Sequence, residues 1–132
     1  MVRHCMDILD RATTAVPAED KYELFLYYIK KVEEYYGVTK TREVYEKALE
    51  NVTDDHVKDI ALRFADLETK LGEIERARAI FVYASQYCNP KVQITFWETW
   101  REFEAHHGNT DTFKEMQRMK RSVEAEFMQV RY

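Results

Sequence analysis

A chain of 132 residues is long enough to bury one hydrophobic core and too short for two ordinary globular domains. Hydrophobic residues make up 45% of it and charged residues 33%, while glycine occurs three times and proline twice, a composition that favours long helices. The formal net charge of −4 disfavours non-specific binding of nucleic acid, which would need a local basic patch. We therefore expect a single all-α unit.

Cysteine use and hydropathy exclude other classes. The two cysteines, Cys5 and Cys88, are far apart and stand in neither a zinc-binding nor a disulfide-scaffold spacing, which predicts a reducing intracellular compartment. No apolar run approaches the roughly 20 residues that a membrane-spanning helix requires. The start of the chain lacks the apolar stretch and cleavage site of a signal peptide. We expect a soluble chain with no membrane contact.

A repeat of about 36 residues organises the sequence. The three glycines lie 35 and 36 residues apart, a glutamate stands four positions before each glycine, and apolar residues stand 12, 8 and 5 positions before it. This apolar spacing is that of an amphipathic helix, and glycine is favoured just past a helix end because it accepts a left-handed conformation. The signature residues are Gly37, Gly72, Gly108, Glu33, Glu68 and Glu104.

A second helix follows each glycine and carries its own repeated pattern. Positions 36 residues apart hold Leu9, Tyr45 and Phe81 in one series and Ala12, Ala48 and Ala84 in another. The segment 3–15 is therefore predicted to be the second helix of a truncated repeat, so that the chain is a piece of a longer array. The predicted helices are 3–15, 19–36, 39–50, 54–71, 74–87, 91–107 and 110–128, which gives repeats at 19–50, 54–87 and 91–128.

Aromatic side chains gather in the first helix of the third repeat, in the stretch FWETWREF. Phe96, Trp100 and Phe103 share one helix face, and Trp97 lies beside them. Helix pairs of this length bury their apolar faces only by stacking on neighbouring pairs, which predicts a right-handed α-α superhelix, or solenoid. We expect the rings to pack between helices, because a base-stacking platform is usually interleaved with basic residues and acidic ones surround these rings.

The last predicted helix, 110–128, departs from the repeat. The positions 36 residues beyond Phe81 and Ala84 hold Gln117 and Lys120 instead of an aromatic and a small residue. A second helix that loses its inward aromatic residue and gains positive charge predicts a polar cap or a surface for a partner. The candidate partner surface is Lys114, Arg118, Lys120 and Arg121.

The recurring glutamates are each followed, on the next helix, by a basic residue: Arg42, Arg78 or Lys114. Because the arrangement recurs in every block, it favours ion pairs within each repeat, or hydrogen bonds at the helix ends, that orient the two helices. These charges are thus predicted to be structural.

The sequence offers no catalytic constellation. His106 and His107 adjoin a helix end, where the helix dipole favours a cation, and no further ligands stand at metal-binding spacing. We find no nucleophile with a nearby base, no phosphate-binding loop and no dinucleotide motif. The predicted protein is not an enzyme and needs no metal, cofactor or small molecule.

An aromatic-rich first helix ending in Phe-Glu or Leu-Glu, followed by Ala-Arg-x-Ile-Phe, resembles the half-a-TPR (HAT) repeat. The segments YIKKVEEYYGVTKTREVYEKALE, LRFADLETKLGEIERARAIFVYASQYCNP and FWETWREFEAHHGNTDTFKEMQRMKRSV resemble the C-terminal HAT repeats of the Syf-type pre-mRNA-splicing scaffold family, also described as XPA-binding. The resemblance covers almost the whole chain, and GNTDTFKEM with KRSV is its most distinctive part.

The resemblance implies a scaffold in the nucleus within the spliceosome. In this family the repeats belong to Prp-nineteen-associated and intron-binding assemblies, near the helicase Aquarius and an Isy-type factor, and the XPA-binding description adds a link to transcription-coupled DNA repair. The expected function is therefore protein–protein interaction in pre-mRNA splicing, with RNA contacted only indirectly.

Two alternatives remain open at this stage. The basic last helix would support direct RNA binding, with an affinity that depends on salt. The second alternative is a role as a spacer or in self-association. Five tyrosines between positions 22 and 36 cannot all face one core, so some of them are expected to be exposed. The missing upstream helix would leave further apolar surface uncovered.

Overall fold

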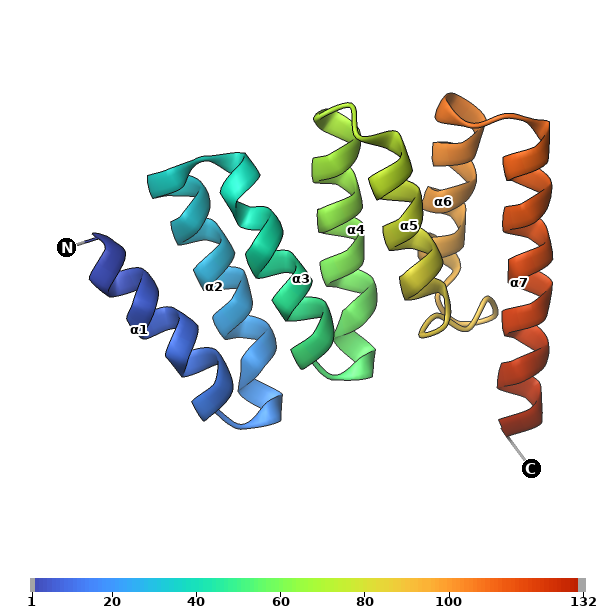
Figure 1. Ribbon diagram of the computed structural model, residues 1–132. Helices are drawn as coiled ribbons and strands as arrows, with labels where there is room; N and C mark the ends of the chain where they lie inside the picture. The colour runs from blue at the N-terminus through green and yellow to red at the C-terminus, as the bar shows by residue number, and fades with distance from the viewer. Residues whose placement is uncertain (1, 131–132) are drawn as a thin grey trace. The chain divides into compact units, whose positions relative to one another are not determined.

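The computed structural model describes residues 2–130, which contain seven α-helices, one short 3-10 helix and no strand. The predicted all-α class is confirmed. The helices are α1 (Val2–Ala15), α2 (Ala18–Tyr36), the 3-10 helix η1 (Val38–Lys40), α3 (Thr41–Asn51), α4 (Asp54–Lys70), α5 (Ile74–Ser85), α6 (Ile94–His107) and α7 (Thr110–Val130), as Figure 1 shows. Contacts divide the chain into two compact units, Met1–Leu67 and Glu68–Tyr132.

The first unit packs α2 against both α1 and α3. Its core contains the fully buried Phe25 of α2, Ala48 of α3 and Ile60 of α4. The ring of Tyr45 in α3 stacks on the ring of Phe64 in α4, with ring centroids 5.0 Å apart. Burial of each such side chain contributes about 1.5–3 kcal/mol, so the recurring apolar positions supply the main stabilisation of this unit.

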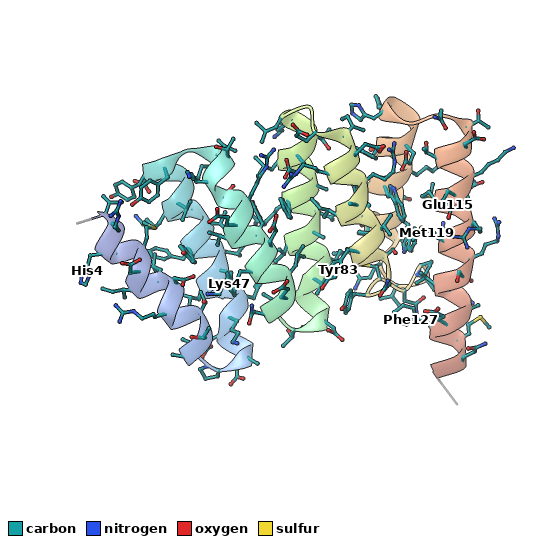
Figure 2. All side chains as sticks on the ribbon, in the orientation of Figure 1. His4, Lys47, Tyr83, Glu115, Met119 and Phe127 are labelled. Carbon is teal, nitrogen blue, oxygen red and sulfur yellow. The ribbon has the colours of Figure 1, made fainter. Side chains whose placement is uncertain are left out.

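Asp10 links three helices of the first unit through its carboxylate. Lys47 of α3, labelled in Figure 2, pairs with Oδ1 of Asp10 in α1 at 2.8 Å. The hydroxyl of Tyr28 in α2 donates to the same oxygen at 3.5 Å. Burial, and then the neighbouring negative charge of Asp10, raise the pKa of Tyr28 to about 12. Tyr28 therefore stays a neutral donor at neutral pH.

The second unit contains α5, α6 and α7, and rings from α5 and α6 form its core. The ring of Phe81 in α5 stacks on Trp100 of α6, with centroids 5.9 Å apart, and tilts against Phe103 at 5.1 Å. Phe96 and Trp97 meet edge to face at 5.4 Å. These rings belong to the FWETWREF stretch, and they lie between helices, where the apolar spacing of the sequence predicts them.

Two predicted helices of the second unit have different bounds. The helix predicted over 91–107 begins at Ile94, because the preceding residues form turns in which the backbone N–H groups of Val92 and Gln93 donate to the carbonyl of Asn89 at 2.9 and 2.7 Å. The helix predicted over 74–87 ends at Ser85. In the first unit, the start of the helix predicted over 39–50 is the separate 3-10 helix η1.

Candidate functional site

Glu104 is a buried carboxylate near the end of α6, with 2% of its surface exposed. Arg78 of α5 donates from Nε to Oε2 and from Nη2 to Oε1, both at 2.9 Å, and Trp100 donates from Nε1 to Oε2 at 3.0 Å. Burial acts to raise the pKa of Glu104, but the hydrogen bonds that it accepts and the positive charge of Arg78 outweigh burial and hold the pKa below its usual value. Glu104 is therefore ionised and joins α5 to α6.

Gly108 lies against this carboxylate. A Cβ atom at this position would stand 2.3 Å from Oε1 of Glu104 and 2.3 Å from the hydroxyl oxygen of Thr112. Gly37 and Gly72 have φ values of 91° and 79°, the left-handed region that glycine accepts, whereas φ at Gly108 is −103°. The left-handed conformation predicted for these glycines is thus present at Gly37 and Gly72, whereas close packing against Glu104 and Thr112 explains the glycine at position 108.

The ion pair of Arg78 differs from the one predicted within its repeat. Arg78 was expected to pair with Glu68 of its own repeat, but it pairs with Glu104 of the following one. Glu68 is fully buried, and Arg76 in the same repeat donates to it from Nε at 3.3 Å. Arg78, the arginine at the recurring position of its repeat, therefore joins that repeat to the next one. Spacing along the chain alone does not distinguish these two partners.

The three signature glutamates also differ in their surroundings. Glu33 is exposed, whereas Glu68 and Glu104 are buried. Of the basic residues expected to pair with them, Arg42 is half-buried in α3 and Lys114 is exposed on α7. The same sequence position therefore has different structural roles in different repeats.

The aromatic and small signature residues are buried in both units. Their exposed fractions are 8% for Tyr45, 3% for Phe81, 0% for Ala48 and Ala84, 2% for Trp97, 1% for Trp100 and 7% for Phe103. These side chains hold helices together, so they offer little surface to a ligand. A functional surface must therefore come from other residues.

The candidate basic residues of α7 are all exposed, but they do not form one patch. Lys114, Arg118 and Arg121 follow each other at intervals of four and three residues and so lie on the side of α7 opposite the buried Met116. Arg118 is bonded to Glu115, with Nε donating to both carboxylate oxygens at 3.0 Å. Glu115 reduces the net positive charge of this outer side.

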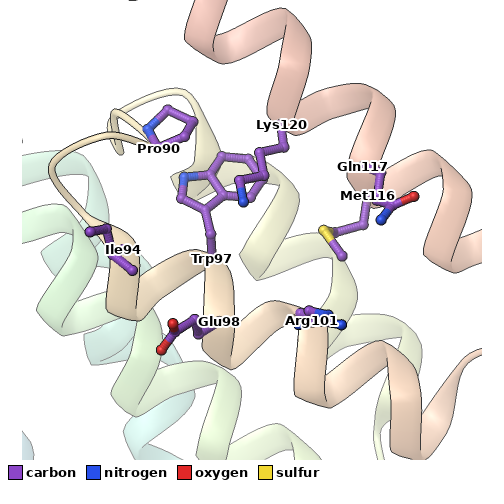
Figure 3. Close-up of a pocket in the computed structure, with 8 residues that line it drawn as sticks. All are labelled: Pro90, Ile94, Trp97, Glu98, Arg101, Met116, Gln117 and Lys120. Carbon is purple, nitrogen blue, oxygen red and sulfur yellow. The ribbon is translucent and has the colours of Figure 1, made fainter.

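Lys120 lies apart from the other three, at the edge of a groove between α6 and α7 (Figure 3). The groove has a volume of about 320 Å³ and combines an apolar floor with charged groups. Its lining includes Ile94, Trp97, Glu98 and Arg101 from α6 and Met116, Gln117 and Lys120 from α7. The departure of α7 from the repeat singled out Gln117 and Lys120 of this lining, but sequence reasoning did not bring them together with the residues of α6 and so missed the groove.

Trp97 is held in the floor of this groove by its own hydrogen bond. Its Nε1 donates to the carbonyl of Cys88, in the turn before α6, at 2.9 Å. The indole is 2% exposed and Met116 of α7 is also 2% exposed. Aromatic content predicts a buried Trp97, but the sequence contains no signal that places it beside Met116.

A second exposed apolar surface lies on α1 and α2. Ile8 is 49% exposed, whereas the residues 36 and 72 positions later, Val44 and Ile80, are 6% and 7% exposed. Tyr27 and Tyr35 of α2, at 52% and 53% exposure, flank the same surface, which includes a hollow of about 370 Å³. The five tyrosines between positions 22 and 36 were predicted not to face one core together, and Tyr27 and Tyr35 are among those that are exposed.

The described residues also bear on metal and membrane binding. Within residues 2–130, no three His, Cys, Asp or Glu side chains stand together in a way that could hold a metal ion. In the same range, no helix has both the length and the apolar character needed to cross a bilayer.

Helices that succeed each other through short turns, with a buried signature repeated about every 36 residues, define a helical-repeat protein of the α-α solenoid class. The chain belongs to the family described as pre-mRNA-splicing factor Syf1/CRNKL1 C-terminal HAT repeat, which matches residues 1–132. The resemblance found in the sequence is thereby confirmed.

Relatives from distant organisms share this segment. The chain is 51% identical over 127 residues to pre-mRNA-splicing factor SYF1 of Homo sapiens and of Rattus norvegicus, and 46% identical over 128 residues to that of Dictyostelium discoideum. These matches cover 96% or 97% of this chain and 15% of each relative. The chain therefore spans about 15% of the length of the relatives that it matches.

Proposed function

We propose that this chain is a non-enzymatic protein-interaction segment of a scaffold that acts in pre-mRNA splicing. The observation that carries the proposal is the identity of 51% to SYF1 over 96% of the chain. The match covers 127 residues and so includes all the helix pairs of the chain.

The geometry supports a scaffold because of how the side chains are used. The conspicuous aromatic and charged residues, such as Trp100, Arg78 and Glu104, are engaged in joining helices. What the helices leave exposed is a groove between α6 and α7, an apolar surface on α1 and α2, and the outer side of α7. Surfaces of this kind bind other proteins, and the residues that carry interface energy are often aromatic or arginine.

The resemblance to the Syf-type family extends the proposal to location and partners. The chain acts in the nucleus, and its partners are spliceosomal proteins, among them the helicase Aquarius, an Isy-type factor and other Prp-nineteen-associated components. A role in transcription-coupled DNA repair belongs to the same proposal and rests on the family resemblance alone.

Affinity capture from nuclear extract tests the proposal. The chain is immobilised, the extract is treated with nuclease, and the recovered proteins are identified by mass spectrometry beside a variant with alanine at Lys114, Arg118, Lys120 and Arg121. Recovery of spliceosomal proteins that survives nuclease supports a protein scaffold, and loss of recovery in the variant assigns the contact to α7. Recovery of no protein besides the bait contradicts the proposal.

Direct RNA binding is a second candidate because of the outer side of α7. Among the described residues, Lys114 and Arg121 make no ion pair, so both are available to phosphate groups. The candidate predicts an RNA affinity that falls with salt, and replacing one phosphate-contacting residue lowers the log–log slope by about one. The overall charge of −4 weighs against it. Recovery that requires intact RNA in the capture experiment favours this candidate over the scaffold.

A further inference from the structure

In the inner repeats, the aromatic residue of each second helix is covered by the first helix of the following repeat. In the first unit, Tyr45 of α3 stacks on Phe64 of α4, the first helix of the following repeat. In the second unit, Phe81 of α5 packs against Phe96 and Trp100 of α6, again the first helix of the following repeat. The aromatic residue of each second helix is thus covered by the next helix in sequence.

On α7 the equivalent positions are exposed and polar. Gln117 stands 36 residues after Phe81, and Lys120 stands 36 residues after Ala84. Alanine at this position leaves room for the close approach of a neighbouring helix, whereas the lysine side chain occupies that space. The surface of α7 therefore differs from that of the inner second helices, and the buried Trp97 and Met116 line its groove.

The charges around this floor define the chemistry of an occupant. Arg101 of α6 and Lys120 of α7 line the groove together with Trp97 (Figure 3), and among the described residues neither makes an ion pair. Glu98 is the single carboxylate in the lining, so positive charge prevails by one. Ile94, 55% exposed, extends the apolar floor to the rim.

We propose that the groove between α6 and α7 binds an acidic amphipathic segment of a partner protein. A large apolar side chain of that segment packs on the exposed Ile94 and on the small part of Trp97 and Met116 that lines the groove, and its carboxylates pair with Arg101 and Lys120. Gln117 supplies an amide that can donate to the segment and accept from it. This inference rests on the proposed scaffold function and assigns the class of partner that one of its surfaces binds.

Nucleic acid fits the groove less well than a protein segment does. A base stacks on an exposed ring face, and the indole of Trp97 is 2% exposed. Glu98 would repel phosphate within the same lining. An amphipathic helix can bind a groove that has apolar residues in its lining and charged residues around them, and this groove has both.

A binding assay with defined peptides tests the proposal. The probe is a fluorescein-labelled peptide of 14 residues, the length of α6, with leucine and tryptophan on one helical face and glutamate on the other. The matched peptide carries lysine in place of glutamate. Fluorescence anisotropy is expected to detect the acidic peptide at micromolar concentrations and to show about tenfold weaker binding of the basic one.

Variants locate the contact. The double variant Arg101→Glu and Lys120→Glu is expected to weaken binding of the acidic peptide about tenfold or more, because two attractive pairs become repulsive. Lys114→Glu reverses a single positive charge on the outer side of α7, half the charge change of the double variant, and should leave the affinity within about twofold. Circular dichroism verifies that each variant is folded, and the indole N–H signal of Trp97 in NMR spectra should shift only when the acidic peptide is added.

Four results would overturn the proposal: no binding of the acidic peptide, equal binding of the basic peptide, equal weakening by Lys114→Glu, or displacement by a short oligouridylate. A doubled mass that Lys120→Glu abolishes would also overturn it, because a second copy of the chain would then occupy the groove. If the peptide assay fails while nuclease-resistant capture of spliceosomal proteins persists, the groove assignment alone is wrong and the scaffold function stands.

Discussion

Arg78 of α5 and Glu104 of α6 form a bidentate pair, in which Nε and Nη2 of the guanidinium each lie 2.9 Å from a different carboxylate oxygen. The pair joins the second helix of one repeat to the first helix of the next. Arg78 is further bonded to Glu75 through Nη1 at 2.6 Å, and its side chain is 19% exposed. A bidentate geometry fixes both distance and orientation, so this pair sets how the two helices meet.

Replacing Arg78 with alanine is expected to destabilise the protein by about 3 kcal/mol, because it leaves the buried carboxylate of Glu104 without its positive partner. Chemical denaturation monitored by circular dichroism measures the change. Arg78→Lys should recover only part of the loss, since an ammonium group cannot reproduce two fixed hydrogen bonds.

The matched control is Glu75→Ala, which removes the exposed partner of the same guanidinium. Its effect on the free energy of unfolding should be much smaller than that of Arg78→Ala, because the Glu75 side chain is 79% exposed. Equal effects of the two substitutions would show that the pair with Glu104 has no special role.

Stability should depend on pH through Glu104. Because its pKa is lower in the folded than in the unfolded chain, its contribution is present above the unfolded value of about 4.3 and is lost as the pH falls through the folded pKa. Urea midpoints measured between about pH 7 and pH 3 should fall more steeply for the native protein than for Glu104→Gln. Parallel curves for the two proteins would contradict this assignment.

Gly108→Ala is expected to destabilise the protein through displacement of Glu104 rather than through backbone strain. The added Cβ would stand 2.3 Å from the carboxylate, and φ is −103°. In a double-mutant cycle with Arg78→Ala, the two losses should therefore be less than additive, with a coupling of about 1 kcal/mol or more. Gly72→Ala is the control: it has open space and a φ of 79°, so its cost should be additive with that of Arg78→Ala. Additivity for Gly108→Ala would contradict the close-packing account.

The period of the sequence predicts most of this fold because amphipathic spacing and glycine positions determine where helices form and which side is buried. Tyr45, Phe81, Ala48 and Ala84 are buried at the positions that the 36-residue spacing indicates. Periodicity does not determine which of two equivalent repeats a side chain reaches. The pairing of Arg78 with the following repeat therefore became evident only in the structure.

The groove was less predictable than the core. The departure of Gln117 and Lys120 from the repeat marks α7 as unusual, but the residues contributed by α6 carry no comparable signal. Their place depends on the late start of α6 at Ile94 and on the hydrogen bond from Trp97 to Cys88. The one basic surface predicted on α7 becomes two because a helix turns by about 100° per residue, which separates Lys120 from its basic neighbours.

The exposed surface of α1 and α2 should lead the isolated chain to self-associate. Ile8 and Tyr27 are 49% and 52% exposed, although the residue equivalent to Ile8 in the next repeat is almost covered. Light scattering at about 100 µM, a range in which weak association is detectable, should give a mass above that of the monomer. Ile8→Glu should restore the monomer mass, and a monomeric native chain at this concentration would contradict the prediction.

An exchange experiment tests whether this chain is a functional segment of a splicing scaffold. The matching segment of human SYF1, 51% identical, is replaced with this chain in cells depleted of SYF1, and intron retention is measured. Splicing is expected to be restored, and the same exchange carrying Arg78→Ala with Glu104→Ala should restore it less well. Intron retention as high as that of a SYF1 lacking the segment would contradict it.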